Sequence, residues 1–216
     1  MVIKIPKLKK NTHKADQESL VAAKDYVKKQ WPLLHKYSPN DTGTLIGLPY
    51  PYIVPAADAD NFAFKEQYYW DSYFTALGYN GTDEQEIVEG MLENMLFLLK
   101  RFGMIPNASR MYFTSRSQPP VLTSYIFYVY DRYGKTKQWL QKRIVQAEKE
   151  YSEVWMSTAH PHWRNIDGLN RYYDINALHD LAEAESGWDM TPRFERKCLD
   201  YLPIDLNALL YKYETD

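Results

Sequence analysis

A chain of 216 residues with a formal net charge of −2, of which 45% are apolar and 25% charged, has the composition of one soluble globular domain, expected to span residues 1–216. The nearly balanced charge and the lack of a basic stripe argue against a nucleic-acid partner. No apolar run approaches the roughly 20 residues of a membrane span, so no membrane partner is expected.

Helical periodicity dominates the chain. Apolar residues at helical spacing, with acidic residues early and basic residues or glycine late, predict the helices. They are expected at residues 16–31, 68–79, 83–103, 121–134, 135–156, 175–186 and 203–214. Ser117 is expected to cap the helix at 121–134. No segment shows a strong alternating strand pattern, so the sequence predicts an all-α fold of six or seven helices.

The connecting segments at 38–61, 103–120 and 160–174 are rich in polar and aromatic residues. Functional residues are common on loops that a rigid scaffold holds in place, so we searched these loops first. The last helix ends without a glycine cap, which suggests that the chain is cut short within a longer domain.

Tyrosine and tryptophan are unusually frequent, with 19 and 6 residues. Both side chains combine an apolar face with a polar edge, which suits carbohydrate recognition. A tyrosine-rich surface is the alternative explanation of the same composition.

The single cysteine, Cys198, cannot form an intramolecular disulfide and is expected to be a buried, small apolar residue. One cysteine is compatible with a reducing compartment. Residues 1–14 are basic but contain no apolar segment of the kind found in signal peptides. These features predict a cytoplasmic protein.

The segment FKEQYYWDSYF, residues 64–74, places Asp71 among aromatic side chains. In a sugar-binding site, Trp70 would stack on a sugar ring and Asp71 would hydrogen-bond to hydroxyl groups. Alternatively, the segment begins a helix in which Asp71 is a capping or dipole residue. Spacing alone does not separate these two interpretations.

The segment GMIPNASRMYFTSRSQPP, residues 103–120, brings Asn107, Arg110, Arg116 and Gln118 into a short span. Planar amide and guanidinium groups are suited to ligands with paired hydroxyl groups. A solvated loop with one arginine paired to a helix end is the alternative.

The segment AEAESGWDMTPRF, residues 182–194, places Glu185 and Asp189 four residues apart around Gly187, which permits a sharp turn. A carboxyl group beside Trp188 is partly desolvated, which favours its neutral, proton-donating form. Alternatively, the segment is a helix end followed by an N-cap at Asp189. The nearby pair His160 and His162 lacks an accompanying cysteine or carboxylate cluster, so neither a metal nor another cofactor is predicted.

These three segments, followed by PIDLNALLY, resemble in order the sequence blocks of the trehalase family, glycoside hydrolase family 37. They also resemble the related glucosylglycerate and mannosylglycerate hydrolases of family 63. The resemblance covers roughly residues 64–211. Each block alone is a weak signal, but four blocks in order are highly specific.

The resemblance implies an (α/α)6 toroid of the six-hairpin glycosidase type, of which this chain would form the first half. It also implies an inverting mechanism with two carboxyl groups, in which Asp189 is the catalytic acid. The expected substrate-binding residues are Lys65, Trp70, Asp71, Asn107, Arg116, Gln118 and Trp188.

Two features depart from the family pattern. Lys65 occupies the position at which trehalases usually have an arginine. A lysine cannot make the bidentate hydrogen-bonded contact of a guanidinium group. The RPES segment expected between NRYYD and SGWD is missing. The sequence ESGWDMTPRF is more similar to that of the family 63 relatives. Their glycerate substrates carry a carboxylate, which a lysine or arginine near the pocket would bind.

The sequence therefore predicts an inverting α-glycosidase that hydrolyses trehalose or a similar small glucoside without a cofactor. Inversion needs a water molecule held between two carboxyl groups about 6.5–9.5 Å apart. In the family, a glutamate acts as the general base, and no residue of this chain matches it. A second chain or a missing C-terminal half is expected to supply this glutamate. The alternatives are a glucosylglycerate or mannosylglycerate hydrolase and a non-catalytic, sugar-binding half-enzyme.

Overall fold

The computed structural model describes residues 17–57, 63–79, 81 and 83–216, and the basic N-terminal stretch lies outside this part of the chain. The α-helices of the described residues are α1 (Gln17–Leu34), α2 (Tyr69–Gly78), α3 (Glu84–Phe102), α4 (Leu122–Arg132), α5 (Lys137–Glu150), α6 (His179–Glu185) and α7 (Ile204–Thr215). Three short 3-10 turns lie at Met111–Phe113, Pro192–Phe194 and Cys198–Asp200. The predicted all-α class is confirmed.

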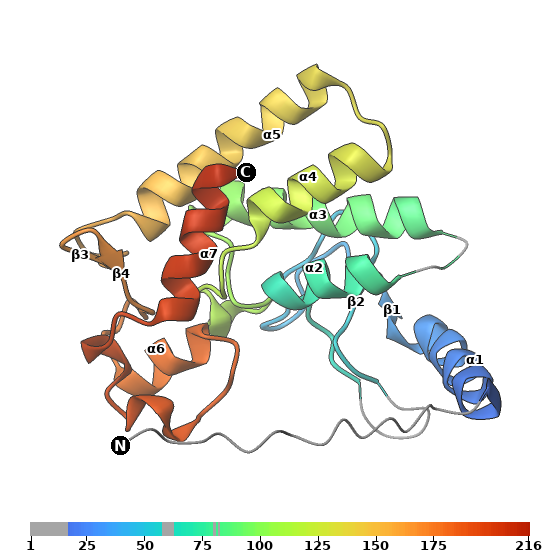
Figure 1. The fold of residues 1–216 in the computed structure, drawn as a ribbon, viewed down its shortest axis with the longest axis horizontal. Helices are drawn as coiled ribbons and strands as arrows, with labels where there is room; N and C mark the ends of the chain where they lie inside the picture. The colour runs from blue at the N-terminus through green and yellow to red at the C-terminus, as the bar shows by residue number, and fades with distance from the viewer. Residues whose placement is uncertain (1–16, 58–62, 80, 82) are drawn as a thin grey trace, which may run out of the picture.

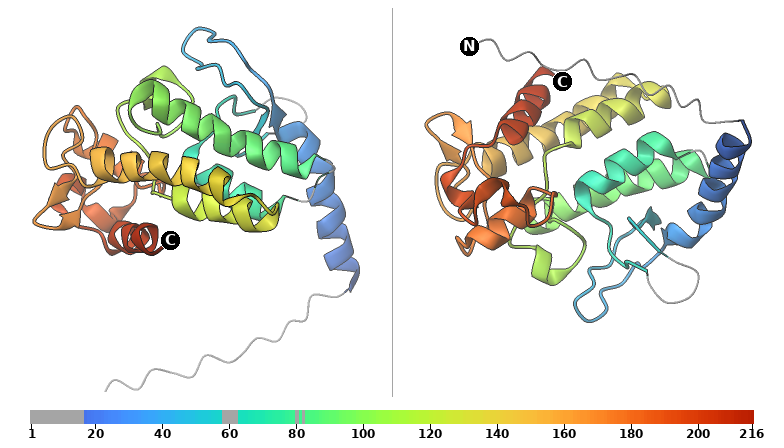
Figure 2. Two further views of the ribbon diagram at one scale, coloured as in Figure 1. Left: turned by 90° about the horizontal axis from the view of Figure 1, so that it is seen from above. Right: turned by 60° about the horizontal axis from the view of Figure 1, so that its bottom comes forward.

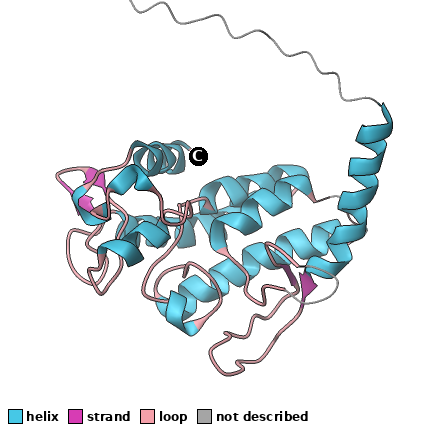
Figure 3. Cartoon of the chain, turned by 90° about the horizontal axis from the view of Figure 1, so that it is seen from below, coloured by secondary structure: helices cyan, strands magenta, loops and turns pink. Residues whose placement is uncertain are grey.

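Strand structure in the described residues is limited to two short antiparallel pairs (Figure 3). Strand β1 (His35–Lys36) pairs with β2 (Tyr52–Ile53), and β3 (Asn165–Ile166) pairs with β4 (Leu169–Asn170). Asp167 and Gly168 join β3 to β4 with φ angles of 50° and 89°. An Asp-Gly pair at positive φ is the preferred chemistry of a two-residue hairpin, and it is the sequence signal that identifies this turn.

Helices α2, α3, α4 and α5 lie alongside one another and form the body of the molecule (Figure 1). Helix α3 has acidic residues in its first turn and Lys100 and Arg101 in its last, as the helix dipole favours. Gly103 follows its last residue as the C-cap, and the φ of 77° at Gly103 lets its N–H donate to the carbonyl of Leu99. The larger core is built around α3, with Leu92 and Met95 fully buried there.

Several predicted helix boundaries were wrong, and the helix expected at 175–186 begins only at His179. Ser117 does not cap α4, because its hydroxyl donates to the carbonyl of Ile105 at 2.7 Å and α4 begins only at Leu122. The helix predicted over 135–156 changes form near its end, since α5 stops at Glu150 and a π-helical turn follows over Tyr151–Trp155. Thr136 caps the start of α5 by accepting the N–H of Trp139 at 3.1 Å.

Seven of the 19 tyrosines are explained by neither sugar stacking nor an exposed surface, because their side chains lie in the interior. Several are buried and use their hydroxyl groups to satisfy polar groups of the interior. Tyr125 donates to the carbonyl of Val88 at 2.8 Å, and Tyr52 donates to the carbonyl of Lys65 at 2.6 Å. The buried tyrosines are Tyr52, Tyr69, Tyr79, Tyr125, Tyr172, Tyr173 and Tyr213.

A second, smaller core lies beneath α6 and α7 and includes Trp155, Tyr172 and Phe194. Cys198 is buried in it, as predicted, and burial raises the pKa of its thiol to about 12. Helix α1 contributes no buried residue and stands away from the body (Figures 1 and 2). Within the described residues, no helix combines the length and the apolar character needed to cross a membrane.

Candidate functional site

Four segments of the chain enclose a cavity of about 330 Å³ near the start of α2. They are the chain between β2 and α2, the beginning of α2, the loop at 103–120, and the end of α6 with the turn that follows it. The cavity is lined by Pro55, Phe64, Tyr68, Trp70, Asp71, Asn107, Phe113, Arg116, Gln118, Ala184, Gly187 and Asp189.

The start of α2 separates core from site within two residues. Tyr69 is buried in the core, whereas Trp70 and Asp71 line the cavity. The N–H of Trp70 belongs to the first helical turn and donates to Oε1 of Gln118 at 3.0 Å. Gln118 also hydrogen-bonds the side chain of Asp71. The loop at 103–120 therefore supplies the cap that α2 lacks and fixes Asp71 at the cavity wall.

Burial raises the pKa of Asp71 above its ordinary value. The hydrogen bond from Gln118 acts in the opposite direction, and the negative charge of Asp189 adds to the increase. Two carboxyl groups on different segments thus face the same small cavity, and the charge of Asp189 acts on Asp71.

Asn107 and Arg116 organise the loop at 103–120. The side-chain amide of Asn107 donates to the carbonyls of Ser117 at 3.0 Å and Ala184 at 3.3 Å, which joins the loop to α6. Arg116 lies over the ring of Phe113 at 5.2 Å and donates to the hydroxyl of Ser115 at 3.2 Å. Its Nε is buried without a hydrogen-bond partner in the protein. A buried donor left unpaired is costly, so this guanidinium is suited to a ligand oxygen.

The turn after α6 brings Asp189 to the cavity. Gly187 has a φ of 73° and Asp189 a φ of 57°, so two of three successive residues are left-handed. This conformation is easy for glycine and tolerated by aspartate. The side chain of Asp189 is exposed at the cavity mouth, contrary to the expected shielding by Trp188.

Comparison with known proteins identifies the family. The family model described as Trehalase matches residues 4–186. This chain belongs to the trehalase family. It is 33% identical to the cytosolic neutral trehalase of Neurospora crassa, over 77% of this chain and 28% of that protein. It is 34% identical to the periplasmic trehalase of Xanthomonas campestris pv. campestris, over 89% of this chain and 41% of that protein.

The trehalase fold is confirmed by a solved structure. The structure matches that of neutral trehalase Nth1 from Saccharomyces cerevisiae with a TM-score of 0.67 and 32% identity, over 76% of this chain and 38% of that one. The helices described here therefore form part of an (α/α)6 toroid. The chain spans between 28% and 41% of the length of these three relatives.

The cavity brings together most of the residues expected from the sequence. Two expected residues lie elsewhere. Lys65 is exposed and does not line the cavity. Trp188 is 56% exposed and meets Trp70 edge to face, with 5.6 Å between the ring centroids. It lines a neighbouring groove of about 560 Å³ instead. The residues around the cavity are Trp70, Asp71, Asn107, Arg116, Gln118 and Asp189.

Sequence reasoning missed several residues that shape this cavity. Tyr68 and Phe113 line the cavity. Both lie within the two motifs at 64–74 and 103–120, and their position beside predicted site residues could have identified them. Glu185, considered together with Asp189, is fully buried behind the cavity. No group of three or more His, Cys, Asp or Glu side chains suited to a metal occurs in the described part of the chain.

Gly187 should be the position around the cavity least tolerant of a larger residue. A Cβ atom there would lie 2.5 Å from the Trp70 ring, at a φ that disfavours other residues. Gly187→Ala is therefore expected to lower the free energy of unfolding by about 2 kcal/mol, through backbone strain and overpacking. It should also alter the fluorescence of Trp70. Urea denaturation and emission spectra measure the two effects.

Gly134→Ala is the matched control, because Gly134 has a φ of 58° but nothing within 4 Å of the added Cβ. It reports the backbone strain alone. Equal losses of stability in the two variants, with unchanged emission, would show that Gly187 is not required by contact with Trp70.

Proposed function

We propose that this chain supplies the general acid and much of the sugar-binding wall of an inverting glycosidase that hydrolyses trehalose. The observation that carries the proposal is the single cavity in which Asp189 faces Trp70, Asp71, Arg116 and Gln118. The trehalases matched here share the family and the fold with this chain.

In the proposed complex, one glucose unit occupies the cavity. The Trp70 ring offers an apolar face to the sugar, and Arg116 and Gln118 offer donors to its hydroxyl groups. Asp71 is held by Gln118 beside them and accepts a hydroxyl hydrogen bond. The aromatic face and the fixed polar groups together orient the anomeric carbon toward Asp189.

Asp189 acts as the general acid in this proposal. Its carboxyl group donates a proton to the glycosidic oxygen as the bond from that oxygen to the anomeric carbon breaks. The exposed position of Asp189 at the mouth lets it reach an oxygen that links a bound glucose to one outside the cavity. Binding of the second glucose would desolvate the acid.

The general base is proposed to come from a second chain or from a further C-terminal part of the same protein. Asp71 and Asp189 are the carboxylates of the described residues that line the cavity. Asp71 is engaged by Gln118 in the first turn of α2, which leaves it a poor candidate for holding water opposite the acid. No cofactor is required by this chemistry. A cytoplasmic location is also proposed, on the single cysteine, although the matched relatives include both cytosolic and periplasmic proteins.

The stereochemistry of the products tests the proposed function. Trehalose joins two α-glucosyl units, so inversion at one anomeric carbon gives one β-glucose and one α-glucose. Retention would give two α-glucose molecules. Proton NMR of the first products, recorded before mutarotation, should show equal amounts of the two anomers. Glucosylglycerate is assayed in parallel, and faster cleavage of that sugar would make it the substrate instead.

Adding azide to the assay allows the same test on a protein that lacks the general base. As an anionic nucleophile, azide attacks the anomeric carbon without a general base, forms a carbon–nitrogen bond and gives β-glucosyl azide. Two α-glucose products would contradict the proposed mechanism. A folded protein that neither binds trehalose nor cleaves it in azide would contradict the proposed function.

A further inference from the structure

Glu185 is a fully buried carboxylate that the proposed mechanism does not use. It is the last residue of α6 and stands four residues before Asp189. Its side chain is 0% exposed, and it lies behind the cavity rather than in its wall. Burying a carboxylate destabilises the folded state unless the group is fully hydrogen-bonded. The hydrogen-bond partners of Glu185 therefore indicate its role.

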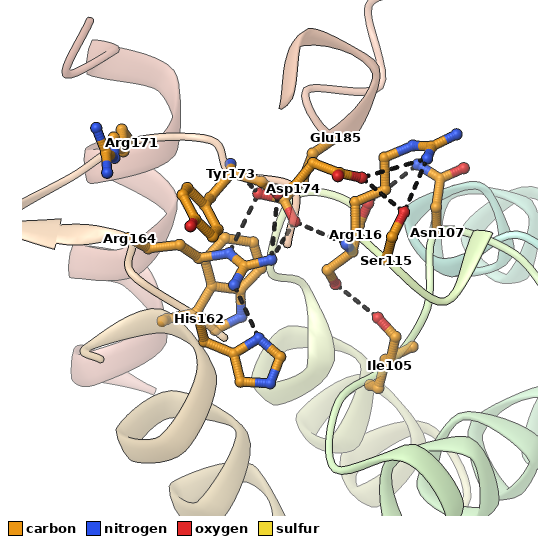
Figure 4. A network of polar contacts seen from close by, with 12 residues as sticks. Ile105, Asn107, Ser115, Arg116, His162, Arg164, Arg171, Tyr173, Asp174 and Glu185 are labelled. Carbon is orange, nitrogen blue, oxygen red and sulfur yellow. Dashed lines mark hydrogen bonds and ion pairs between the residues drawn. The ribbon is translucent and has the colours of Figure 1, made fainter. Parts of the chain in front are cut away.

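Four N–H donors from three segments converge on the two oxygens of Glu185 (Figure 4). Oε1 accepts the backbone N–H of Ser117 at 2.7 Å and an Nη2 hydrogen of Arg164. Oε2 accepts the backbone N–H of Tyr173 at 2.7 Å and the Nε hydrogen of Arg164 at 3.2 Å. The carboxylate therefore ties α6 to the loop at 103–120 and to the segment after β4.

Arg164 is equally buried, so the two charges balance each other. Its Nη1 lies 3.2 Å from Nδ1 of His162, and its guanidinium lies 5.2 Å from the centre of the Trp155 ring. Burial lowers the pKa of His162 to about 4, and the charge of Arg164 adds to this effect. A neutral His162 can accept a hydrogen bond from Arg164 but cannot neutralise it. Glu185 is therefore the counter-charge of Arg164.

The position of Glu185 links the two sides of the cavity. Ser117, which it holds, stands between Arg116 and Gln118 on the sugar-binding side. On the other side, three residues separate Glu185 from Asp189. The far end of the same turn is also fixed, because Glu183 accepts the backbone N–H of Thr191 at 2.7 Å. The spacing between the acid and the sugar-binding loop is thus set through Glu185.

We propose that Glu185, paired with Arg164, is a positioning residue that holds Asp189 at the distance from the bound sugar that proton donation requires. This inference rests on the proposed function. A carboxylate is needed because a glutamine at this position would turn its NH₂ group toward an N–H donor on one side. Glu185→Gln would also leave the positive charge of Arg164 uncompensated.

The experiment compares two substrates that differ in their need for the acid. Cleavage of trehalose needs a proton on the departing glucose oxygen. Cleavage of α-glucosyl fluoride releases fluoride ion, which leaves without a proton. Both reactions are measured in azide, which attacks the anomeric carbon, so the source of the general base does not affect the comparison. The expected result for Glu185→Gln is a loss of about 100-fold on trehalose, the scale of a misplacement near 1 Å, with little change on the fluoride.

Arg164→Lys provides a second variant should Glu185→Gln fail to fold. It keeps the positive charge but approaches the carboxylate with one nitrogen instead of two, and a smaller loss confined to trehalose is expected. Asp180→Asn is the control on the same helix, because Asp180 pairs with Arg196 at 3.2 Å in an exposed position. It should leave both rates unchanged.

Parallel losses on both substrates, or an unchanged trehalose rate in folded Glu185→Gln, would overturn the positioning role and leave the pair as a stabilising contact. The proposed function fails differently. In that case the unmodified protein would cleave neither substrate, and the positioning role would fall with it.

Discussion

Asp189→Asn is expected to lower the rate of trehalose cleavage about 10²–10⁴-fold while binding of trehalose is retained. Asparagine has nearly the same shape as aspartate and tolerates the left-handed φ of 57° found at this position. The turn after α6 should therefore keep its conformation. The amide has no proton to transfer to the glycosidic oxygen, so only the chemical step is affected.

Glucose release and calorimetric titration with trehalose measure the two quantities. Asp167→Asn is the matched control, since Asp167 is also exposed and left-handed, with a φ of 50° in the β3–β4 turn. It should change neither quantity. Retained cleavage of trehalose in Asp189→Asn would assign the acid to another group. Loss of binding together with cleavage would indicate a structural role for Asp189.

The sequence predicted which side chains within continuous motifs lie together at the cavity. Trp70 and Asp71 are adjacent at a helix start, and Arg116 and Gln118 lie two residues apart in one loop, so local geometry determines how each pair faces the cavity. Lys65 was carried over from the family pattern alone. Its exposed side chain does not line the cavity.

The contacts of Glu185 could not be predicted in the same way. They join residues 12, 21 and 68 positions away, and each depends on where three loops cross. Helical periodicity identifies elements but does not specify how their connecting segments meet. The sequence showed Glu185 as one acid of a pair four residues apart. Only the fold shows that one member is exposed at the cavity and the other is buried against Arg164.

The buried tyrosines raise a related point about the interior of the molecule. Tyr69 and Tyr213 are far apart in the sequence, yet both hydroxyls donate to Oε2 of Glu150, at 3.0 Å and 2.8 Å. Tyr69 in turn accepts the N–H of Leu122 at 3.1 Å, at the start of α4. Glu150 thus sits where α2, α4, α5 and α7 meet, and its charge state should affect the stability of the whole arrangement.

Burial raises the pKa of Glu150 from 4.5 to about 7. The hydrogen bonds from Tyr213 and Tyr69 and the charge of Arg164 act in the opposite direction but do not compensate. The folded protein therefore binds this proton more tightly than the unfolded chain. The contribution of Glu150 to stability is complete below about pH 4.5, falls as the pH rises to about 7, and is constant above that.

Glu150→Gln is expected to abolish this loss, which amounts to about 3 kcal/mol between pH 4.5 and pH 7. Glutamine does not titrate. The free energy of unfolding of the variant, relative to that of the unmodified protein, should therefore increase as the pH rises through this range. Urea denaturation at intervals from pH 5 to pH 8 measures the difference. The difference is used because His162, whose pKa burial lowers to about 4, contributes in the opposite direction and cancels when the two proteins are compared.

The exposed residue Glu148 on the same helix provides the control, and Glu148→Gln should leave the pH dependence as it is. A constant difference in stability between Glu150→Gln and the unmodified protein across this range would show that Glu150 is ionised at every pH tested. The tyrosine hydroxyls would then outweigh desolvation. A decreasing advantage of the unmodified protein as the pH rises would instead mean that the four-helix junction is held by a carboxylic acid, and that it weakens when that acid loses its proton.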